Sequence, residues 1–325
     1  MDKVKVGFIG CGGIAQFHFG HMEKIDEVNV VAVCDLIQEK ADRTAARFDA
    51  TAYTSYADMF EREELDAVYV CVEPSAHDGM EMMAIERGIN LFVQKPMTLD
   101  LAYAKDVRDA IADKGLVSGV GFQCRYVDTI PRVKAWLDGQ DIGMVVCTRL
   151  GGLPMVWWWR QHEHSGGQVV EQSIHNYDIL RCLLGEVEAV HGMSRRGVVK
   201  DIENYNTDDA SAVTMHFKSG VIASLASGCF SAGGFGASGF DFYTRQGCMN
   251  YGLGGNFKIR QPNFTVEGKP GNDYGQESDD TFIDAVLDKD PTLVMSPYAD
   301  AYKSLELTLA INESMAKGGE LVQLS

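Results

Sequence analysis

Residues 3–15 read KVKVGFIGCGGIA, and this stretch decides the fold. Residues 3–9 alternate in polarity and are rich in β-branched side chains, which predicts a buried strand. The glycines end that strand, and a helical pattern follows from residue 14 to residue 25. A second apolar run, residues 28–34, ends at Asp35. The order is therefore strand, glycine turn, helix, strand and acid.

The glycine turn has the features that a dinucleotide requires. Gly10 allows a tight turn, and Gly12 lets the backbone approach a pyrophosphate. The pyrophosphate would lie on the free N–H groups of the helix that begins near Gly13. Asp35 would accept hydrogen bonds from the adenosine ribose and repel a 2′-phosphate. Because Leu36 and Ile37 follow it, with no arginine, we expect NAD as the cofactor and regard NADP as the less favoured one.

The composition narrows the class of protein. A chain of 325 residues with 46% hydrophobic and 23% charged residues suggests two globular domains. The formal net charge of −17 argues against nucleic acid or an anionic membrane as a partner. The sequence has no C-x-x-C pair among its eight cysteines, no run long enough for a membrane span and no apolar leader before the first strand. We therefore expect a cytoplasmic protein.

The pattern of elements changes near residue 122. Before it, apolar strands at residues 66–72, 90–94 and 116–121 alternate with helices, which predicts a doubly wound parallel sheet. After it, apolar strands joined by short glycine turns predict a mostly antiparallel sheet. The sequence thus predicts an α/β protein with a Rossmann NAD-binding domain at residues 1–122 and a second α/β domain for substrate binding and oligomerisation at residues 123–325.

Lys95 is the first candidate for catalysis. It follows a predicted strand and precedes Pro96, so it lies at the carboxyl end of the sheet, where ligands bind. An amine there can hydrogen-bond a substrate oxygen and help to move a proton. A plain surface lysine is the alternative, and position alone does not separate the two.

Glu171, His175 and Asp178 form the second candidate. We expect one helix that follows Gly166 and Gly167 and runs to about Leu184, on which the spacing i, i+4 and i+7 places the three side chains on one face. A histidine between two carboxylates can hold a proton near neutral pH. The alternative is a solvated polar face, which is the commoner explanation of such a spacing.

Two further segments invite a functional interpretation. The pair of histidines in residues 162–164 is too sparse for a metal site, and we predict no metal. The run Trp157-Trp158-Trp159-Arg160 could stack on a sugar ring and grip its hydroxyls, or it could pack between domains. Both explanations of the tryptophan run remain open.

Together these segments resemble the glucose–fructose oxidoreductase/inositol dehydrogenase (Gfo/Idh/MocA) family. The resemblance rests on residues 10–15, on Glu73-Pro74-Ser75-Ala76-His77, on Gln94-Lys95-Pro96 and on Gly166-Gly167 through Asp178. It implies a Rossmann domain, a second domain whose open sheet face forms a homodimer or homotetramer, and NAD(P)-dependent oxidation or reduction of a sugar or cyclitol.

The resemblance also implies roles for single residues. Lys95 matches the lysine of the family's Glu-Lys-Pro motif, His175 matches the usual acid/base, and Glu171 stands where Asp is usual. Gln94 stands where Glu is usual, and Ser173 where Gly is frequent. Catalysis is expected from Lys95, His175 and Glu171. Substrate binding is expected from Lys95, Arg125, Trp158, Arg160, Glu171 and His175. Cofactor binding is expected from Gly10, Gly12, Gly13, Ile14, Asp35, Val72, Pro74, His77, Gln94, Lys95 and Gln123.

Three functions fit these expectations. The first is an NAD-dependent dehydrogenase of a small-molecule sugar, sugar derivative, cyclitol or other polyol. The alternative is an NAD-dependent glycoside hydrolase that oxidises a ring carbon transiently. The third, favoured only by Gln94 and Glu171, is an NAD-sensing protein without catalysis.

Overall fold

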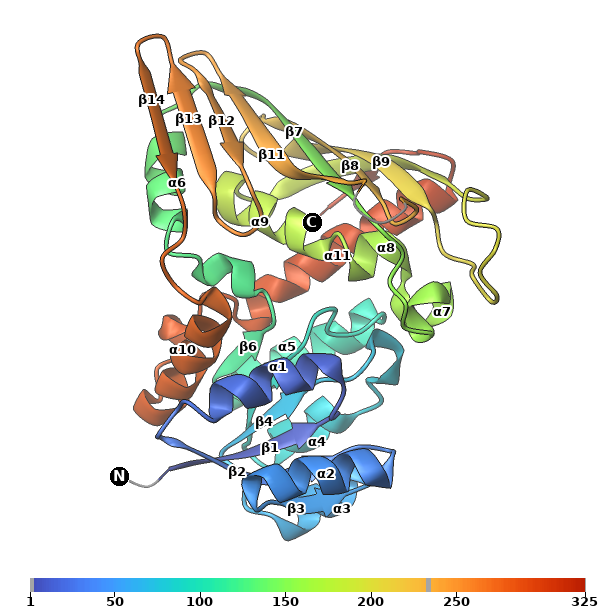
Figure 1. Ribbon diagram of the computed structural model, residues 1–325, viewed down its shortest axis with the longest axis vertical. Helices are drawn as coiled ribbons and strands as arrows, with labels where there is room; N and C mark the ends of the chain where they lie inside the picture. The colour runs from blue at the N-terminus through green and yellow to red at the C-terminus, as the bar shows by residue number, and fades with distance from the viewer. Residues whose placement is uncertain (1–2, 232–234, 325) are drawn as a thin grey trace. The chain divides into compact units, whose positions relative to one another are not determined.

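The computed structural model describes residues 3–231 and 235–324 (Figure 1). Two compact units can be distinguished. The first contains the residues up to Gln123 together with Asp273–Tyr302, and the second contains Cys124–Asn272 together with the residues from Lys303 onward. Within the described residues, none of the helices combines the length and the apolar character that crossing a bilayer requires.

A parallel sheet forms the centre of the first unit. In the described residues its strand order is β3-β2-β1-β4-β5-β6, and every neighbouring pair is parallel. The order reverses beside β1, which is the topological switch of a doubly wound sheet. The predicted Rossmann fold is confirmed. The strands are β1 (Val4–Ile9), β2 (Val28–Cys34), β3 (Thr51–Tyr53), β4 (Ala67–Val70), β5 (Asn90–Val93) and β6 (Ser118–Val120).

Helices alternate with these strands along the chain, as the sequence predicts. The first helix ends at Met22 rather than at residue 25, and the helix after β2 covers Gln38–Phe48. The helices of this unit are α1 (Gly13–Met22), α2 (Gln38–Phe48), α3 (Tyr56–Arg62), α4 (Met80–Glu86), α5 (Leu101–Lys114) and α10 (Tyr274–Asp288), with short 3-10 turns η1 (Pro74–Ala76) and η4 (Pro291–Leu293).

The core of the first unit includes a segment from late in the chain. Phe8, Tyr69 and Phe92 stack across β1, β4 and β5 with ring centroids 4.7 and 4.6 Å apart. Phe282 of α10 meets Tyr69 and Phe92 edge-on, at 5.5 and 5.3 Å. The division at residue 122 assigns α10 to the second domain, but residues 273–302 belong to the first unit, and Phe282, Ile283 and Val286 of α10 are buried in its core. The sequence analysis did not predict this helix.

The second unit is built on a large, mostly antiparallel sheet, as expected. In the described residues its strand order is β14-β13-β12-β11-β7-β10-β9-β8-β15, and the β7–β10 pair alone among these neighbours is parallel. The sequence analysis missed β13, β14 and β15. The strands are β7 (Ile142–Leu150), β8 (Val187–Arg195), β9 (Ala210–Phe217), β10 (Ile222–Gly228), β11 (Ala237–Thr244), β12 (Cys248–Tyr251), β13 (Phe257–Gln261), β14 (Phe264–Gly268) and β15 (Val322–Gln323).

Helices cover one face of this sheet (Figure 1). Along β7, Val145 and Cys147 are buried toward them, whereas Met144 and Val146 are exposed on the other face. The helices of this unit are α6 (Ile130–Leu137), α7 (His162–Ser165), α8 (Gly167–Glu171), α9 (Ile174–Leu184) and the greater part of α11 (Tyr298–Ala316), with 3-10 turns η2 (Gln123–Tyr126) and η3 (Trp158–Arg160).

The prediction of one continuous helix between Gly167 and about Leu184 is wrong. The chain forms α8 and α9 with a break at Gln172 and Ser173. The Ser173 N–H donates to the Gln168 carbonyl at 2.9 Å, five residues back, and its hydroxyl donates to the Gln168 side chain at 3.1 Å. This wide turn interrupts the i→i−4 ladder, because a serine side chain competes for nearby backbone and side-chain partners.

Candidate functional site

The predicted cofactor residues follow strands that end at one edge of the first sheet. Ile9 pairs with Cys34 and with Val70, and Val93 pairs with Val70 and with Val120. The glycine turn, Asp35, Val72, Lys95 and Gln123 come just after these strand ends. Carboxyl ends of parallel strands at a topological switch are where α/β proteins bind ligands. We refer to this region as the carboxyl edge.

The glycine turn has the shape that a pyrophosphate requires. Gly10 has φ +94°, and a Cβ built there would lie 2.4 Å from the Cys71 carbonyl oxygen, so glycine is needed. A Cβ at Gly12 or at Gly13 would meet nothing within 4 Å, which leaves the start of α1 open to a ligand. Ile14 is partly exposed on the first turn. Burial raises the pKa of the Cys11 thiol to about 11, so this turn carries no thiolate charge at neutral pH.

Asp35 accepts hydrogen bonds from the backbone, including that of the glycine turn. Its Oδ2 accepts the Cys11 N–H at 2.9 Å, and its Oδ1 accepts the Ile37 N–H at 2.9 Å. A carboxylate has about four acceptor positions, so both oxygens retain capacity for ribose hydroxyls. Leu36 and Ile37 are exposed beside it. The residues present therefore fit a dinucleotide.

Three residues after β4 are expected near the cofactor. Val72 is partly exposed and Pro74 is buried in η1, whereas the side chain of His77 is buried against a carboxylate. His77 Nδ1 pairs with Glu81, whose other oxygen accepts the Tyr103 hydroxyl at 2.6 Å. Burial opposes the charge of Glu81, but its pairing with His77 and Tyr103 holds the pKa of this carboxyl below its usual range. His77 Nδ1 thus has a buried carboxylate partner, and a contact of His77 with the cofactor remains a prediction.

Gln94 is buried at the carboxyl edge and contacts His18 of α1, which in turn contacts Asp279 of α10. Its Nε2 lies 2.5 Å from His18 Nε2, and His18 Nδ1 lies 2.8 Å from Asp279 Oδ2. His21 Nδ1 lies 2.6 Å from the same oxygen. The Gln94 Oε1 accepts the backbone N–H of Lys95 at 3.3 Å. Lys95 itself is partly exposed, as a residue that meets substrate must be.

The second unit supplies Glu171 and His175. Glu171 ends α8 and is buried, and its Oε2 accepts the Trp159 indole N–H at 2.6 Å. His175 is half-buried on the first turn of α9. The longer side chain of Glu171 is thus held by a tryptophan of η3, which the sequence analysis did not assign as its partner.

His175 and Asp178 lie three residues apart on α9. Asp178 is buried, and its two oxygens accept the Arg125 Nη2 and Nε at 2.6 and 2.8 Å. The Ser304 hydroxyl donates to the same carboxylate at 2.8 Å. The break between α8 and α9 interrupts the single helical face expected of Glu171, His175 and Asp178, and a role for Asp178 beside His175 remains a prediction. Arg125, expected to bind substrate, has this bidentate ion pair inside the second unit.

The tryptophan run divides into one buried and two accessible rings. Trp159 is buried against Glu171, Trp158 is partly exposed, and Trp157 is largely exposed. Arg160 Nη2 donates to the Met155 carbonyl at 3.1 Å. Packing thus accounts for Trp159, and the role of Trp158 and Arg160 in substrate binding remains a prediction.

Sequence reasoning missed His18, His21 and Asp279. The two histidines stand three residues apart in an apolar helix, and this spacing puts both on one buried face. The sequence therefore contained a signal that the two histidines lie together. Asp279 is 258 residues from His21, and nothing local indicates that α10 returns to the first sheet.

Comparison with protein families gives the identity of both units. The model of the Gfo/Idh/MocA oxidoreductase family, NAD-binding Rossmann fold, matches residues 4–122. A Gfo/Idh/MocA C-terminal domain model matches residues 131–250. The chain belongs to the Gfo/Idh/MocA oxidoreductase family. The expected family and its NAD-binding Rossmann domain are confirmed.

Curated relatives of this family member include inositol dehydrogenases. The chain is 28% identical over 225 residues to scyllo-inositol 2-dehydrogenase (NAD(+)) of Bacillus subtilis (strain 168), which covers 67% of this chain and 65% of the relative. It is 24% identical to myo-inositol 2-dehydrogenase of Thermotoga maritima, covering 67% and 66%. The alignments thus span just under two thirds of the length of these relatives.

Solved structures share the whole fold. A levoglucosan dehydrogenase in complex with NADH has a TM-score of 0.85 at 19% identity, with all of both chains covered. The WlbA dehydrogenase from Bordetella pertussis, in complex with NADH and UDP-GlcNAcA, has a TM-score of 0.85 at 22% identity, with 99% of both chains covered. At these identities the likeness shows the fold.

Proposed function

We propose that this chain is an NAD-dependent dehydrogenase that moves a hydride between nicotinamide and a hydroxyl carbon of a sugar, sugar derivative or cyclitol. The observation that carries the proposal is the carboxyl edge, where an open glycine turn, Asp35 and Lys95 follow neighbouring parallel strands. The inositol dehydrogenases among its relatives support a polyhydroxylated ring as substrate.

NAD supplies the hydride acceptor when it is bound. In our proposal the backbone N–H groups at the start of α1 hold the pyrophosphate, and Asp35 accepts from the ribose hydroxyls. Asp35 also favours NAD over NADP, because its carboxylate repels a 2′-phosphate.

Lys95 and His175 carry the proton chemistry in this proposal. His175 accepts the proton of the substrate hydroxyl as general base, and the Lys95 ammonium stabilises the negative charge that develops on the same oxygen. Glu171, fixed by Trp159, supports the segment that leads into α9. Trp158 and Arg160 are proposed to contact the rest of the ring.

A substrate panel tests this function. Purified protein with NAD is mixed with inositols, sugars and sugar acids, and absorbance of the reduced nicotinamide is recorded. We expect turnover of at least one polyol, which Lys95→Ala lowers about 100-fold or more while NAD affinity stays within about twofold. Unchanged turnover in Lys95→Ala would remove it from the mechanism. Cleavage of a chromogenic glycoside without net NADH would favour the glycosidase alternative, and NAD binding without either activity would favour a sensor.

We also propose that the open face of the second sheet joins copies of the chain into a homodimer or homotetramer. Met144 (42% exposed) lies opposite Tyr243 (50%), and Ile222 (43%) adjoins them from β10. Contiguous exposed apolar side chains on one sheet face are typical of an interface. Light scattering of Met144→Glu should show monomers where the wild type shows oligomers.

We propose that the protein is located in the cytoplasm. All eight cysteines lie in the described part of the chain and are free thiols. Burial raises the pKa of Cys147 and of Cys34, the latter to about 12, so these thiols are inert rather than redox-active. Thiol titration of protein purified without reductant should count eight free cysteines after unfolding.

A further inference from the structure

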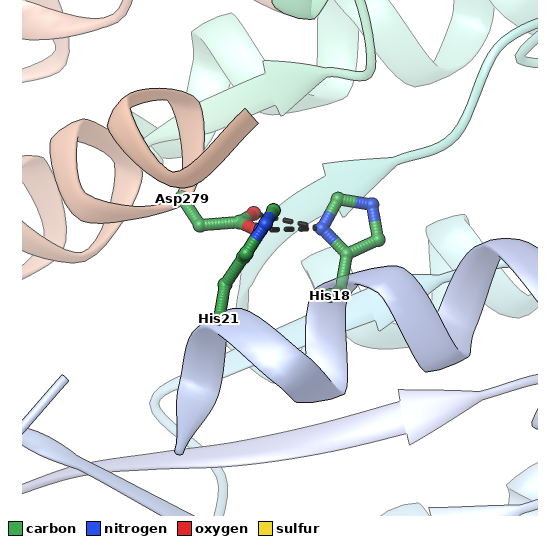
Figure 2. Close-up of side chains that lie close together, drawn as sticks. All are labelled: His18, His21 and Asp279. Carbon is green, nitrogen blue, oxygen red and sulfur yellow. Dashed lines mark hydrogen bonds and ion pairs between the residues drawn. The ribbon is translucent and has the colours of Figure 1, made fainter. Parts of the chain in front are cut away.

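A buried cluster in the first unit ties α10 to α1. His18 and His21 stand on the inward face of α1, and Asp279 of α10 points between them (Figure 2). All three side chains are almost completely buried. Burial raises the pKa of the Asp279 carboxyl, but the interactions with His18 and His21 outweigh this and hold the pKa below its usual range. The carboxylate is therefore ionised and satisfied by two imidazoles.

The orientation of the Gln94 amide follows from its backbone contact. Its oxygen faces the N–H of Lys95 at 3.3 Å, so the other end of the amide, an N–H donor, faces His18 Nε2 at 2.5 Å. A donor requires an acceptor, and Nε2 of His18 is therefore unprotonated. The ring proton lies on Nδ1, where it is donated to Asp279. The contacts on both sides of the ring thus assign the proton positions of His18 in this inference.

Gly121 packs against the Gln94 amide and restricts its position. A Cβ built at Gly121 would lie 2.4 Å from Gln94 Oε1 and 2.7 Å from its Cδ. The amide therefore packs directly on the backbone after β6, and it has little room to rotate. The result is a continuous hydrogen-bond chain from the Asp279 carboxylate through His18 and Gln94 to the Lys95 N–H.

We propose that Asp279 and His18 are positioning residues that hold the Gln94 amide in one orientation and thereby fix the backbone of Lys95. This inference rests on the proposed function of Lys95. The carboxylate comes from α10, 184 residues after Lys95 in the sequence, so the late segment of the chain contributes to the geometry of the carboxyl edge.

A metal ion is the competing explanation of two histidines and one carboxylate. Ligands of tetrahedral zinc, about 2.0–2.2 Å from the ion, lie about 3.3 Å from one another. Here Asp279 Oδ2 lies 2.8 and 2.6 Å from the two imidazole nitrogens. These are hydrogen-bond separations, and His18 already uses its second nitrogen for Gln94.

The first experiment compares two matched variants, His18→Phe and His21→Phe. Each removes one of the two imidazoles of α1 that hydrogen-bond Asp279, but of the two only His18 contacts Gln94. We expect His18→Phe to lower kcat about tenfold or more with the KM for NAD nearly unchanged, because misplacement of a catalytic group lowers rate more than binding. We expect His21→Phe to stay within about twofold of wild type. Equal losses of kcat in both variants would overturn the proposal.

A spectroscopic experiment tests the tautomer without any substrate. In protein labelled with 15N-histidine, the His18 signals are identified by their absence from the His18→Phe spectrum. We expect its Nε2 shift in the unprotonated range and its Nδ1 shift in the protonated range. In Gln94→Glu, a carboxylate that only accepts faces Nε2, and the Nε2 signal should move to the protonated range.

Two results of this second experiment contradict the inference. One is a protonated Nε2 in the wild type. The other is stoichiometric binding of added Zn²⁺ that His18→Phe abolishes. If no polyol is turned over, the proposed dehydrogenase function fails, and the nitrogen shifts still decide whether the hydrogen-bond chain exists. If His18→Phe does not fold, a signal that moves in Gln94→Glu identifies His18 instead.

Discussion

Replacing Arg125 by methionine should destabilise the second unit, since the Arg125–Asp178 pair lies in its interior. Arg125 is 8% exposed and Asp178 is 1% exposed. The variant leaves the Asp178 carboxylate with the Ser304 hydroxyl and with Arg181, whose Nη1 is 4.0 Å away. Removing one partner of a buried pair costs about 3–5 kcal/mol. Because Arg181 compensates in part, we expect about 3 kcal/mol, or a loss of about 6–12 °C in Tm.

The control is a pair of the same unit whose arginine is exposed. Arg196 Nε donates to Asp208 at 2.7 Å, and the two side chains are 57% and 10% exposed. Because water reaches the arginine and weakens the interaction, Arg196→Met should lower the free energy of unfolding by less than Arg125→Met does. Urea titration followed by fluorescence measures both variants. If the two lose the same stability, or if Arg125→Met changes only the KM for substrate, our account of the Arg125–Asp178 pair is wrong.

Three further substitutions test the first unit. Gly10→Ala should lower the free energy of unfolding by about 2–4 kcal/mol in a urea titration, because φ is +94° and the new Cβ meets the Cys71 carbonyl; a loss below 1 kcal/mol would contradict the turn geometry. Asp35→Asn keeps an acceptor for the backbone but removes the charge, so the ratio of NADP to NAD affinity should rise about tenfold in a binding titration, and an unchanged ratio would count against the ribose contact. Burial alone would raise the pKa of Glu81, but its pairing with His77 holds the folded-state pKa below the ordinary value. The pair therefore contributes stability above about pH 4.5, and this contribution is lost as the pH falls through the folded-state pKa. Glu81→Gln should therefore flatten the acid limb of the stability profile between pH 5 and pH 3, measured against the wild type by urea unfolding.

The local elements of the first unit could be read from the sequence because each has a strong period and clear end signals. The helix at residues 38–48 and the strands around the glycine turn are examples. The order strand, glycine turn, helix, strand and acid also fixes which residues reach the carboxyl edge, since parallel strands all end there. Lys95 and Asp35 were therefore identifiable without coordinates.

The break between α8 and α9 could not be predicted in this way. The residues up to Leu184 have a helical period, but the Ser173 N–H donates to the Gln168 carbonyl and the Ser173 hydroxyl donates to the Gln168 side chain, which forms a local turn. Because the helix is interrupted between Glu171 and His175, their i, i+4 spacing no longer places these two side chains on one helical face. Their partners, Trp159 and Arg125, come from other segments of the second unit.

The sequence by itself determined the doubly wound sheet, the glycine turn, the family and the identity of the candidate lysine and histidine. These depend on periodicity and on motifs whose physical causes are local. The tertiary structure alone decided that α10 returns to the first sheet, that Asp279 lies beside His18 and His21, and that Arg125 is bound to Asp178. Such contacts join residues 53 to 261 positions apart, and they form because buried carboxylates and imidazoles must find partners in the interior.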